Sequence, residues 1–277
     1  MFRKFIKGIF SKFGYQIKKQ IPESSKVSIE RYKVLENNFQ NIAREYEKSF
    51  LQDRDYIPKN EVRFNLLSRG EGTPPTEAYF LIDSIHKSTE VPGDVCEFGV
   101  AQGETSALIA NEISTFTNKK LHLFDSFEGL PAPTDKDQLK DDIFDLGDIK
   151  AYEGQMSSPE ELVLDRLKSL SFPTSRFILH KGFIEEIINS GQNFPDKVSF
   201  AYVDFDFYEP IKIALEFLHR KTSIGSIIMI DDYDWFSTGA KSAVDEFLEI
   251  NNSKNDIYDL FIPDKRLGHF AILERKG

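Results

Sequence analysis

The sequence predicts a doubly wound α/β fold, in which a mostly parallel seven-stranded sheet carries helices on both faces and follows an N-terminal helical appendage. After residue 76, short runs that are apolar on both faces alternate with amphipathic stretches, as in a covered parallel sheet. Only residues 263–268 separate the last two runs, so these should form an antiparallel hairpin at one edge. The predicted strands are 94–98, 121–124, 177–180, 199–203, 226–230, 257–262 and 270–273, and the helices between them are 104–114, 159–170, 184–190, 209–221 and 240–250.

The composition fits one large α/β domain with an appendage. The chain has 277 residues, of which 40% are hydrophobic and 29% charged. A net charge of −10 is opposite in sign to what phosphate-backbone binding needs, which argues against nucleic acid as a partner. The single cysteine, Cys96, lies in an apolar run and cannot form an internal disulfide, so we expect a reducing, cytoplasmic location.

The appendage is predicted to cover residues 1–62 and the main domain residues 63–277. An apolar seam of about six helical turns steps by threes and fours through Ile29, Tyr32, Leu35, Phe39, Ile42, Tyr46 and Phe50. Such a seam packs either on its own domain or on a second copy of the chain. Of these alternatives we expect a homo-oligomer.

Residues 1–20 predict a basic amphipathic helix. Phenylalanine and isoleucine recur there at helical spacing, and basic residues without any acid stand between them. Lys7 and Lys12 interrupt the continuous apolar core that a signal peptide would show. We expect this helix to cover a neighbouring subunit or to touch the inner membrane surface weakly. No apolar stretch in the sequence is long enough to span a bilayer.

The first strand end carries a possible ligand turn. Gly99 and Gly103 allow close approach to the backbone, and Thr105 stands at the start of the following helix. A dinucleotide fingerprint would need a third glycine. Glu97, a carboxylate in a strand expected to be buried, disfavours a diphosphate and favours a ligand with an ammonium or sulfonium group.

The second and third strand ends suggest how a nucleoside would be held. Asp125 closes the second strand, where a carboxylate can accept hydrogen bonds from ribose hydroxyls. Alternatively, it caps a turn. At the third strand end, the backbone around Gly182 and the ring of Phe183 could border an adenine.

Carboxylates follow both the fourth and the fifth strand. Asp204 and Asp206 end one strand, and Asp231 and Asp232 end the next. Neighbouring parallel strands lie roughly 5 Å apart, so these acids should converge at one edge of the cleft. Like charges repel unless a cation lies among them, and an all-oxygen set suits Mg²⁺, with Mn²⁺ next. The sequence therefore predicts a metal site at Asp204, Asp231 and Asp232, while Asp234 is better explained as a helix cap or a solvent-facing acid.

The interval 131–158 is rich in aspartate and has little periodicity. An irregular segment of this length is either a cover over a ligand site or a mobile solvated insert. Both interpretations stay open at this point.

Taken together, these motifs resemble the macrocin-type O-methyltransferases, metal-dependent S-adenosylmethionine enzymes that tailor the sugars of antibiotics. The resemblance covers roughly residues 63–275 and rests on several short motifs: 92–94 leading into 97–100, 125–131, 204–209, 230–233 and 243–245. It implies a class I methyltransferase with a Rossmann-like sheet. Two positions depart from related patterns: Phe205 stands where the family usually has glycine, and Phe207 excludes the lysine of the more distant catechol-type enzymes.

By this resemblance the cofactor and metal sites can be assigned residue by residue. Asp204, Asp231 and Asp232 match the metal ligands, with Asp204 also the proposed base and a neighbour of the cofactor. The remaining cofactor-binding candidates are Glu97, Phe98, Gly99, Gly103, Glu104, Thr105, Asp125, Ser126, Gly182 and Phe183.

The expected function is Mg²⁺-dependent methylation of a hydroxyl on a sugar or glycoside. One rival is an NAD-dependent oxidoreductase on a similar sheet, which Glu97 and the missing glycine disfavour. The other is a catalytically silent, oligomeric or membrane-attached scaffold. We expect the acceptor to contact residues 56–75, 131–158 and 233–238.

Overall fold

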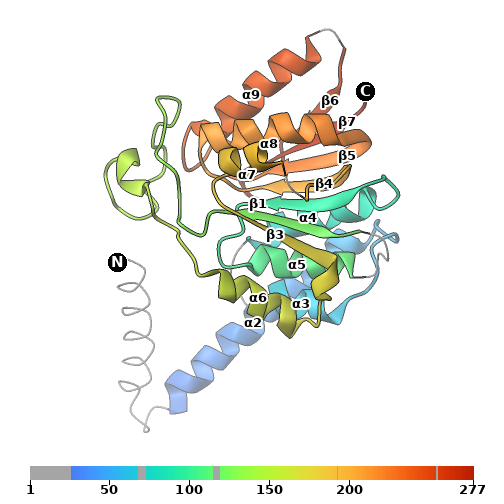
Figure 1. Ribbon diagram of the computed structural model, residues 1–277. Helices are drawn as coiled ribbons and strands as arrows, with labels where there is room; N and C mark the ends of the chain where they lie inside the picture. The colour runs from blue at the N-terminus through green and yellow to red at the C-terminus, as the bar shows by residue number, and fades with distance from the viewer. Residues whose placement is uncertain (1–25, 68–72, 115–118, 192, 254) are drawn as a thin grey trace. The chain divides into compact units, whose positions relative to one another are not determined.

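A computed structural model describes residues 26–67, 73–114, 119–191, 193–253 and 255–277 (Figure 1). The chain divides into two compact units, residues 1–58 and 59–277, and the sequence placed this boundary a few residues further along. In the first unit, α2 (Lys26–Leu51) contains the predicted apolar seam. Near the end of that helix the ring of Tyr46 stacks on Phe50 with centroids 6.3 Å apart, while the side chain of Ile42 is 70% exposed.

The predicted basic helix at residues 1–20 lies outside the described part of the chain. Among the helices that are described, none is both long enough and apolar enough to cross a membrane.

The second unit is built on a seven-stranded sheet with the order β3-β2-β1-β4-β5-β7-β6. The first five strands in this order pair in parallel, and β7 pairs antiparallel with both β5 and β6. The predicted fold and the antiparallel edge hairpin are therefore confirmed. The strands are β1 (Asp94–Phe98), β2 (Leu121–Asp125), β3 (Phe177–Lys181), β4 (Val198–Val203), β5 (Thr222–Ile230), β6 (Tyr258–Phe261) and β7 (Ala271–Arg275).

Helices cover both faces of the sheet, as Figure 1 shows. On one face lie α7 (Ile184–Ser190), α8 (Tyr208–Lys221) and α9 (Gly239–Asn252). On the other lie α3 (Glu61–Leu67), α4 (Pro75–Lys87), α5 (Glu104–Ile113) and α6 (Glu160–Ser169). Because both faces are covered, every residue of β4 is buried.

Two of these helices were missed by the sequence analysis. No helix was predicted between residues 51 and 104, yet α3 occupies part of the interval 56–75 that was expected to contact the acceptor. The next helix, α4, begins at Pro75, a residue that is favoured in the first turn, and its inner face contributes Leu81, Ile82 and Ile85 to the core. The apolar periodicity of the sequence did not reveal these helices, because α3 is only 7 residues long and glycines follow it in the sequence.

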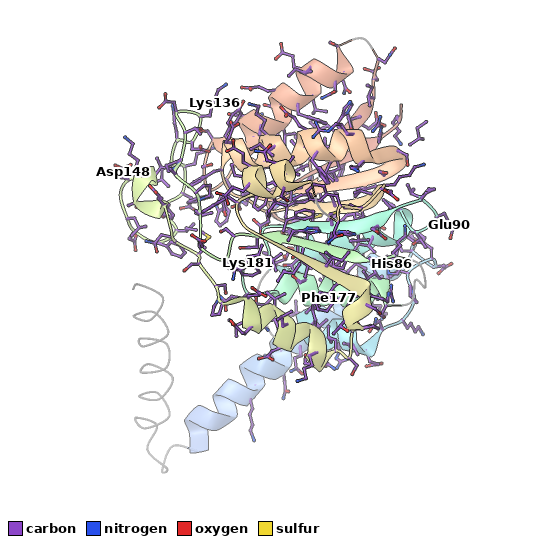
Figure 2. All side chains as sticks on the ribbon, viewed as in Figure 1. His86, Glu90, Lys136, Asp148, Phe177 and Lys181 are labelled. Carbon is purple, nitrogen blue, oxygen red and sulfur yellow. The ribbon has the colours of Figure 1, made fainter. Side chains whose placement is uncertain are left out.

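The segment between β2 and α6 has little regular structure but a small core of its own. Buried Tyr152 packs with Leu130, Phe207 and Phe236, and a single bridge joins Leu139 to Ser237. A short 3₁₀ helix, η1 (Ile149–Tyr152), lies in this segment, and a second, η2 (Thr174–Arg176), follows α6. Figure 2 shows Lys136 and Asp148 on this projecting segment. The packing favours the cover over the solvated insert.

Candidate active site

A cavity of about 640 Å³ opens at the carboxyl ends of the parallel strands. β1 and β4 are neighbours in the sheet, and the strand order reverses between them, which is where doubly wound sheets bind ligands. The three segments expected to meet the acceptor each contribute to the lining, through Thr73, Ile143, Met156 and Trp235 among others. Phe205, which stands where the resemblance led us to expect glycine, also lines the cavity. Its ring packs edge-on against that of Phe98, with centroids 6.0 Å apart.

Gly99 and Asp204 come into direct backbone contact at the floor of the cavity. Gly99 has a φ of +87°, and a Cβ built on it would lie 1.8 Å from the carbonyl oxygen of Asp204. The Asp204 N–H donates to the carbonyl of Phe98 at 2.7 Å. Only glycine fits here, because any side chain would push the turn after β1 away from the aspartate that follows β4.

Glu97 is a fully buried carboxylate without a hydrogen-bond partner. Both of its oxygens, and the nearby hydroxyl of Ser106, are unpaired among the described residues. Burial raises the pKa of Glu97 to about 8, and the charges of Asp125 and Glu104 act in the same direction. An unpaired buried polar group is costly, so this position calls for a donor that the chain itself does not supply.

Asp125 is bonded to the turn after β1. Its Oδ2 accepts from the N–H groups of Val100 (2.7 Å) and Ala101 (2.8 Å), and its Oδ1 accepts from Phe127 (2.6 Å). A carboxylate has about four acceptor sites, so roughly one is left for a ligand hydroxyl rather than the two that the sequence argument allowed. Asp125 therefore shapes the glycine turn as well as facing the cavity.

Most of the cofactor candidates line the cavity, although Glu97 does not, and Glu104 there forms an ion pair with Arg166. The other lining candidates are Gly99, Thr105, Asp125, Ser126, Gly182, Phe183 and Asp204, and the metal candidates Asp231 and Asp232 line the cavity as well. Gly103 instead packs against Val163 at the start of α5. Phe98 lies in the core, stacked on Phe124 with ring centroids 4.4 Å apart, and its role in cofactor binding stays a prediction.

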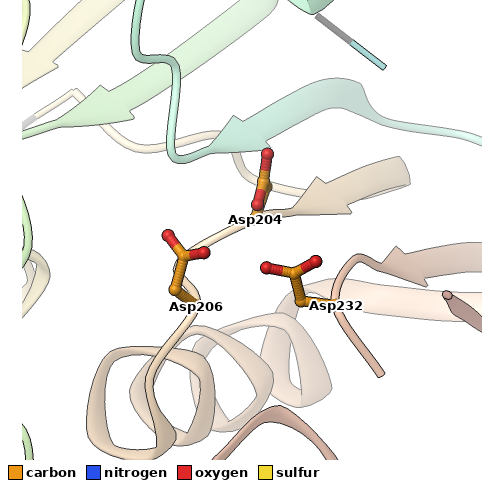
Figure 3. Close-up of side chains that lie close together, drawn as sticks. All are labelled: Asp204, Asp206 and Asp232. Carbon is orange, nitrogen blue, oxygen red and sulfur yellow. The ribbon is translucent and has the colours of Figure 1, made fainter. Parts of the chain in front are cut away.

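Three carboxylates gather at the end of β4 and β5, namely Asp204, Asp206 and Asp232 (Figure 3). One oxygen from each lies within 4.8 Å of the others. Asp206 and Asp232 both adopt left-handed backbone conformations, with φ values of 62° and 55°. Such strained positions cluster at functional sites, and here they turn the side chains toward Asp204.

The charges of this cluster are unbalanced. Burial and the neighbouring aspartates raise the pKa of Asp204 and of Asp232 well above the usual range, and burial and Asp204 raise that of Asp206 to about 8. Below the cluster, burial and the charge of Asp231 raise the pKa of Glu77 to about 11. A bound cation would remove this penalty.

Asp231 lies at the predicted strand end, and both of its oxygens are bonded within the protein. The hydroxyl of Tyr202 donates to its Oδ2 at 2.6 Å, and the backbone N–H of Asp232 donates to its Oδ1 at 2.8 Å. The oxygens that converge belong to Asp204, Asp206 and Asp232, so Asp206 enters the set from geometry, and the ligand role of Asp231 stays a prediction.

The sequence analysis expected Asp206 to converge with the other acids but did not include it in the metal set, and it gave no role to Glu77. A signal for Asp206 was present, since an acid two residues after Asp204 follows the same strand end. Nothing local marks Glu77, because it belongs to a helix far from β4 and β5 in the chain.

The residues present fit two groups. The unpaired carboxylate of Glu97 suits the ammonium group of a methionine moiety, beside a turn that can take its nucleoside. The all-oxygen set of Asp204, Asp206 and Asp232 suits a hard divalent cation such as Mg²⁺.

A seven-stranded doubly wound sheet ending in an antiparallel hairpin, with its ligand turn after β1 and an acid after β2, defines a class I methyltransferase. The family described as macrocin-O-methyltransferase (TylF) matches residues 80–262. The chain belongs to this family and is an S-adenosylmethionine-dependent O-methyltransferase. Among curated proteins, none matches the chain.

Solved structures agree with this fold. The O-methyltransferase NovP is similar with a TM-score of 0.60 and 19% identity, covering 74% of this chain and 81% of its own. CalS11, a calicheamicin methyltransferase, has a TM-score of 0.59 and 22% identity over 86% of this chain and 91% of its own. TomG from Streptomyces achromogenes, solved in complex with SAM, has a TM-score of 0.51 and 13% identity, covering 84% and 95%.

Proposed function

We propose that this methyltransferase acts on a hydroxyl of a sugar or glycoside and that it requires Mg²⁺, with Mn²⁺ as a substitute. The observation that carries the metal proposal is the convergence of Asp204, Asp206 and Asp232 beside the glycine turn. The family assignment supports a sugar acceptor, and CalS11 is itself described as a TDP-rhamnose 3′-O-methyltransferase.

The residues of the chain have two roles in this proposal, which are to bind the cofactor and to accept a proton. Glu97 binds the ammonium group of S-adenosylmethionine, and Asp125 accepts a ribose hydroxyl while it holds the turn. Gly99, Thr105, Ser126, Gly182 and Phe183 line the rest of the cofactor region, together with Glu104. Holding sulfur, methyl carbon and acceptor oxygen nearly in line contributes much of the rate.

In the reaction a C–O bond forms, the C–S bond breaks with its electron pair left on sulfur, and the hydroxyl proton moves to a base. A divalent cation supplies an acidifying effect on the hydroxyl. Asp204 is the base proposed from sequence, and Asp206 is the second candidate because it faces the same point. Comparing Asp204→Asn with Asp206→Asn in pH–rate profiles separates them.

We also infer a homo-oligomer, supported by the exposed apolar side chain of Ile42 on α2, and a cytoplasmic location, supported by the free thiol of Cys96, the chain's one cysteine. Weak attachment of residues 1–20 to an anionic membrane surface stays a prediction, because those residues lie outside the described chain.

The deciding experiment incubates the protein with methyl-labelled S-adenosylmethionine, Mg²⁺ and a panel of glycosides and nucleotide sugars. Labelled product that disappears with a chelator supports the proposal. Tight binding of S-adenosylhomocysteine without turnover on any acceptor would instead favour the silent scaffold.

A further inference from the structure

Beneath the aspartate cluster lie two buried polar side chains to which the proposed function gives no task. Tyr202 on β4 is fully buried, and Glu77 on α4 is only 2% exposed. The hydroxyl of Tyr202 lies 2.6 Å from Asp231 Oδ2 and 3.5 Å from Glu77 Oε1. Because a tyrosine has one proton to donate, the shorter contact to Asp231 is the donated bond.

The carboxyl group of Glu77 also lies near Asp231, whose charge, after burial, is a cause that raises the pKa of Glu77. The turn before β7 packs tightly over it: Gly268 has a φ of +147°, and a Cβ built there would lie 2.7 Å from Glu77 Oε2. Glu77 is therefore fixed between α4 and this turn.

The other oxygen of Asp231 connects these contacts to the aspartate cluster. Asp231 Oδ1 accepts the backbone N–H of Asp232, whose left-handed conformation turns its carboxylate toward Asp204 and Asp206. A change in the orientation of Asp231 would release this backbone bond and allow Asp232 to relax toward an ordinary conformation.

We propose that Glu77 and Tyr202 are positioning residues for the metal site: they fix Asp231, which in turn holds Asp232 in the conformation that completes the carboxylate set. The proposal rests on the proposed metal dependence. It holds whether or not Asp231 is itself a ligand, because its effect on Asp232 passes through the backbone bond.

The test uses the full chain saturated with S-adenosylhomocysteine and measures binding of Mg²⁺, and of Mn²⁺ alone, by calorimetry. Tyr202→Phe removes only the hydroxyl and should weaken metal affinity about 10- to 100-fold, with the affinity for S-adenosylhomocysteine unchanged. Activity should return at high metal concentration, which a general folding defect would not allow. Tyr258→Phe is the matched control, since this buried tyrosine on β6 bonds His219 and Thr222, the latter at the opposite end of β5 from Asp231.

A second pair of variants tests the same point without the tyrosine. Glu77→Gln keeps a polar side chain of the same length beside Tyr202 and should bind Mg²⁺ like the wild type, whereas Glu77→Met fills the space without a polar group and should lose affinity. Equal metal affinity in wild type, Tyr202→Phe and Glu77→Met overturns the proposal. A wild-type protein that binds neither ion overturns the metal-dependent function and this proposal together.

Discussion

The carboxylate of Asp125 and the backbone of Val100 are joined across the edge of the sheet, with Asp125 Oδ2 accepting the Val100 N–H at 2.7 Å. Asp125, which lines the cavity, thus also holds the turn after β1. The carboxylate of Asp125 accepts from three N–H groups through two oxygens. In Asp125→Asn only one oxygen can accept, because the other is replaced by an amide nitrogen that donates.

Loss of such charge-assisted bonds costs about 1.5–3 kcal/mol, so affinity for S-adenosylhomocysteine should fall roughly 10- to 100-fold. Calorimetry checks this, with Asp259→Asn, an exposed acid on β6, as the control. Unchanged affinity in Asp125→Asn would contradict the assignment.

Ligand binding should remove a proton from Glu97. Its pKa of about 8 means that it is mainly protonated at pH 7 in the free protein, and an ammonium group beside it favours the ionised form. Calorimetry in buffers of different ionisation enthalpy should show close to one proton released per S-adenosylhomocysteine bound. Glu97→Gln should bind more weakly and lose this release, and an equal release from both proteins would place the proton elsewhere.

The same group sets a pH dependence of stability. Because the folded pKa of Glu97 lies above its ordinary value of 4.5, the ligand-free folded protein binds more protons than the unfolded chain between about pH 4.5 and 8. The stability that Glu97 contributes is complete below this window and is lost as the pH rises through 8. We expect the Tm of Glu97→Gln to rise relative to wild type across the window, as measured by calorimetric scans, and a constant difference would refute the shift.

How far the sequence predicted the site depended on where each contact lies along the chain. Gly99, Asp125 and Asp204 follow apolar runs, so a parallel sheet alone brings them to one edge. The position of the Asp206 side chain was harder to predict, because Asp206 follows the end of β4 and strand alternation does not apply there. Its left-handed backbone conformation sets the direction of the side chain instead. Glu77 meets Asp231 only through the packing of α4 on the sheet, a tertiary contact that no local pattern encodes.

Removing one charge from the aspartate cluster should stabilise the metal-free protein. Asp232 is buried and its pKa is raised by burial and by Asp231 and Asp206, so Asp232→Asn relieves repulsion and should raise the Tm in excess chelator. Added Mg²⁺ should then raise the Tm of wild type but not of the variant, whose turnover is lost. Asp256→Asn, an exposed acid, is the control. Full wild-type activity in excess chelator would end the metal hypothesis.

The exposed apolar side chain of Ile42 on α2 provides a test of self-association. If the seam is an interface between copies, Ile42→Glu places a charge in it and should lower the mass measured by light scattering. Asn37→Glu adds the same charge at an exposed position away from the seam on this helix and is the control. Equal masses for wild type and both variants would show that the seam is not an interface between copies.

The charge of the cavity should select the acceptor. None of the described lining residues is lysine, arginine or histidine, and those that are acidic are Glu104, Asp125, Glu185, Glu186, Asp204, Asp206, Glu209, Asp231 and Asp232. A diphosphate would add negative charge to this negative field, so uncharged or amino-bearing glycosides should react with higher kcat/KM than nucleotide sugars carrying the same sugar. Trp235 is the chain's one tryptophan and lines the cavity, so its fluorescence reports acceptor binding directly in the complex with S-adenosylhomocysteine. Tighter binding of the nucleotide sugar in that titration, together with its faster turnover, would reverse this selection and require cations from residues outside the described lining.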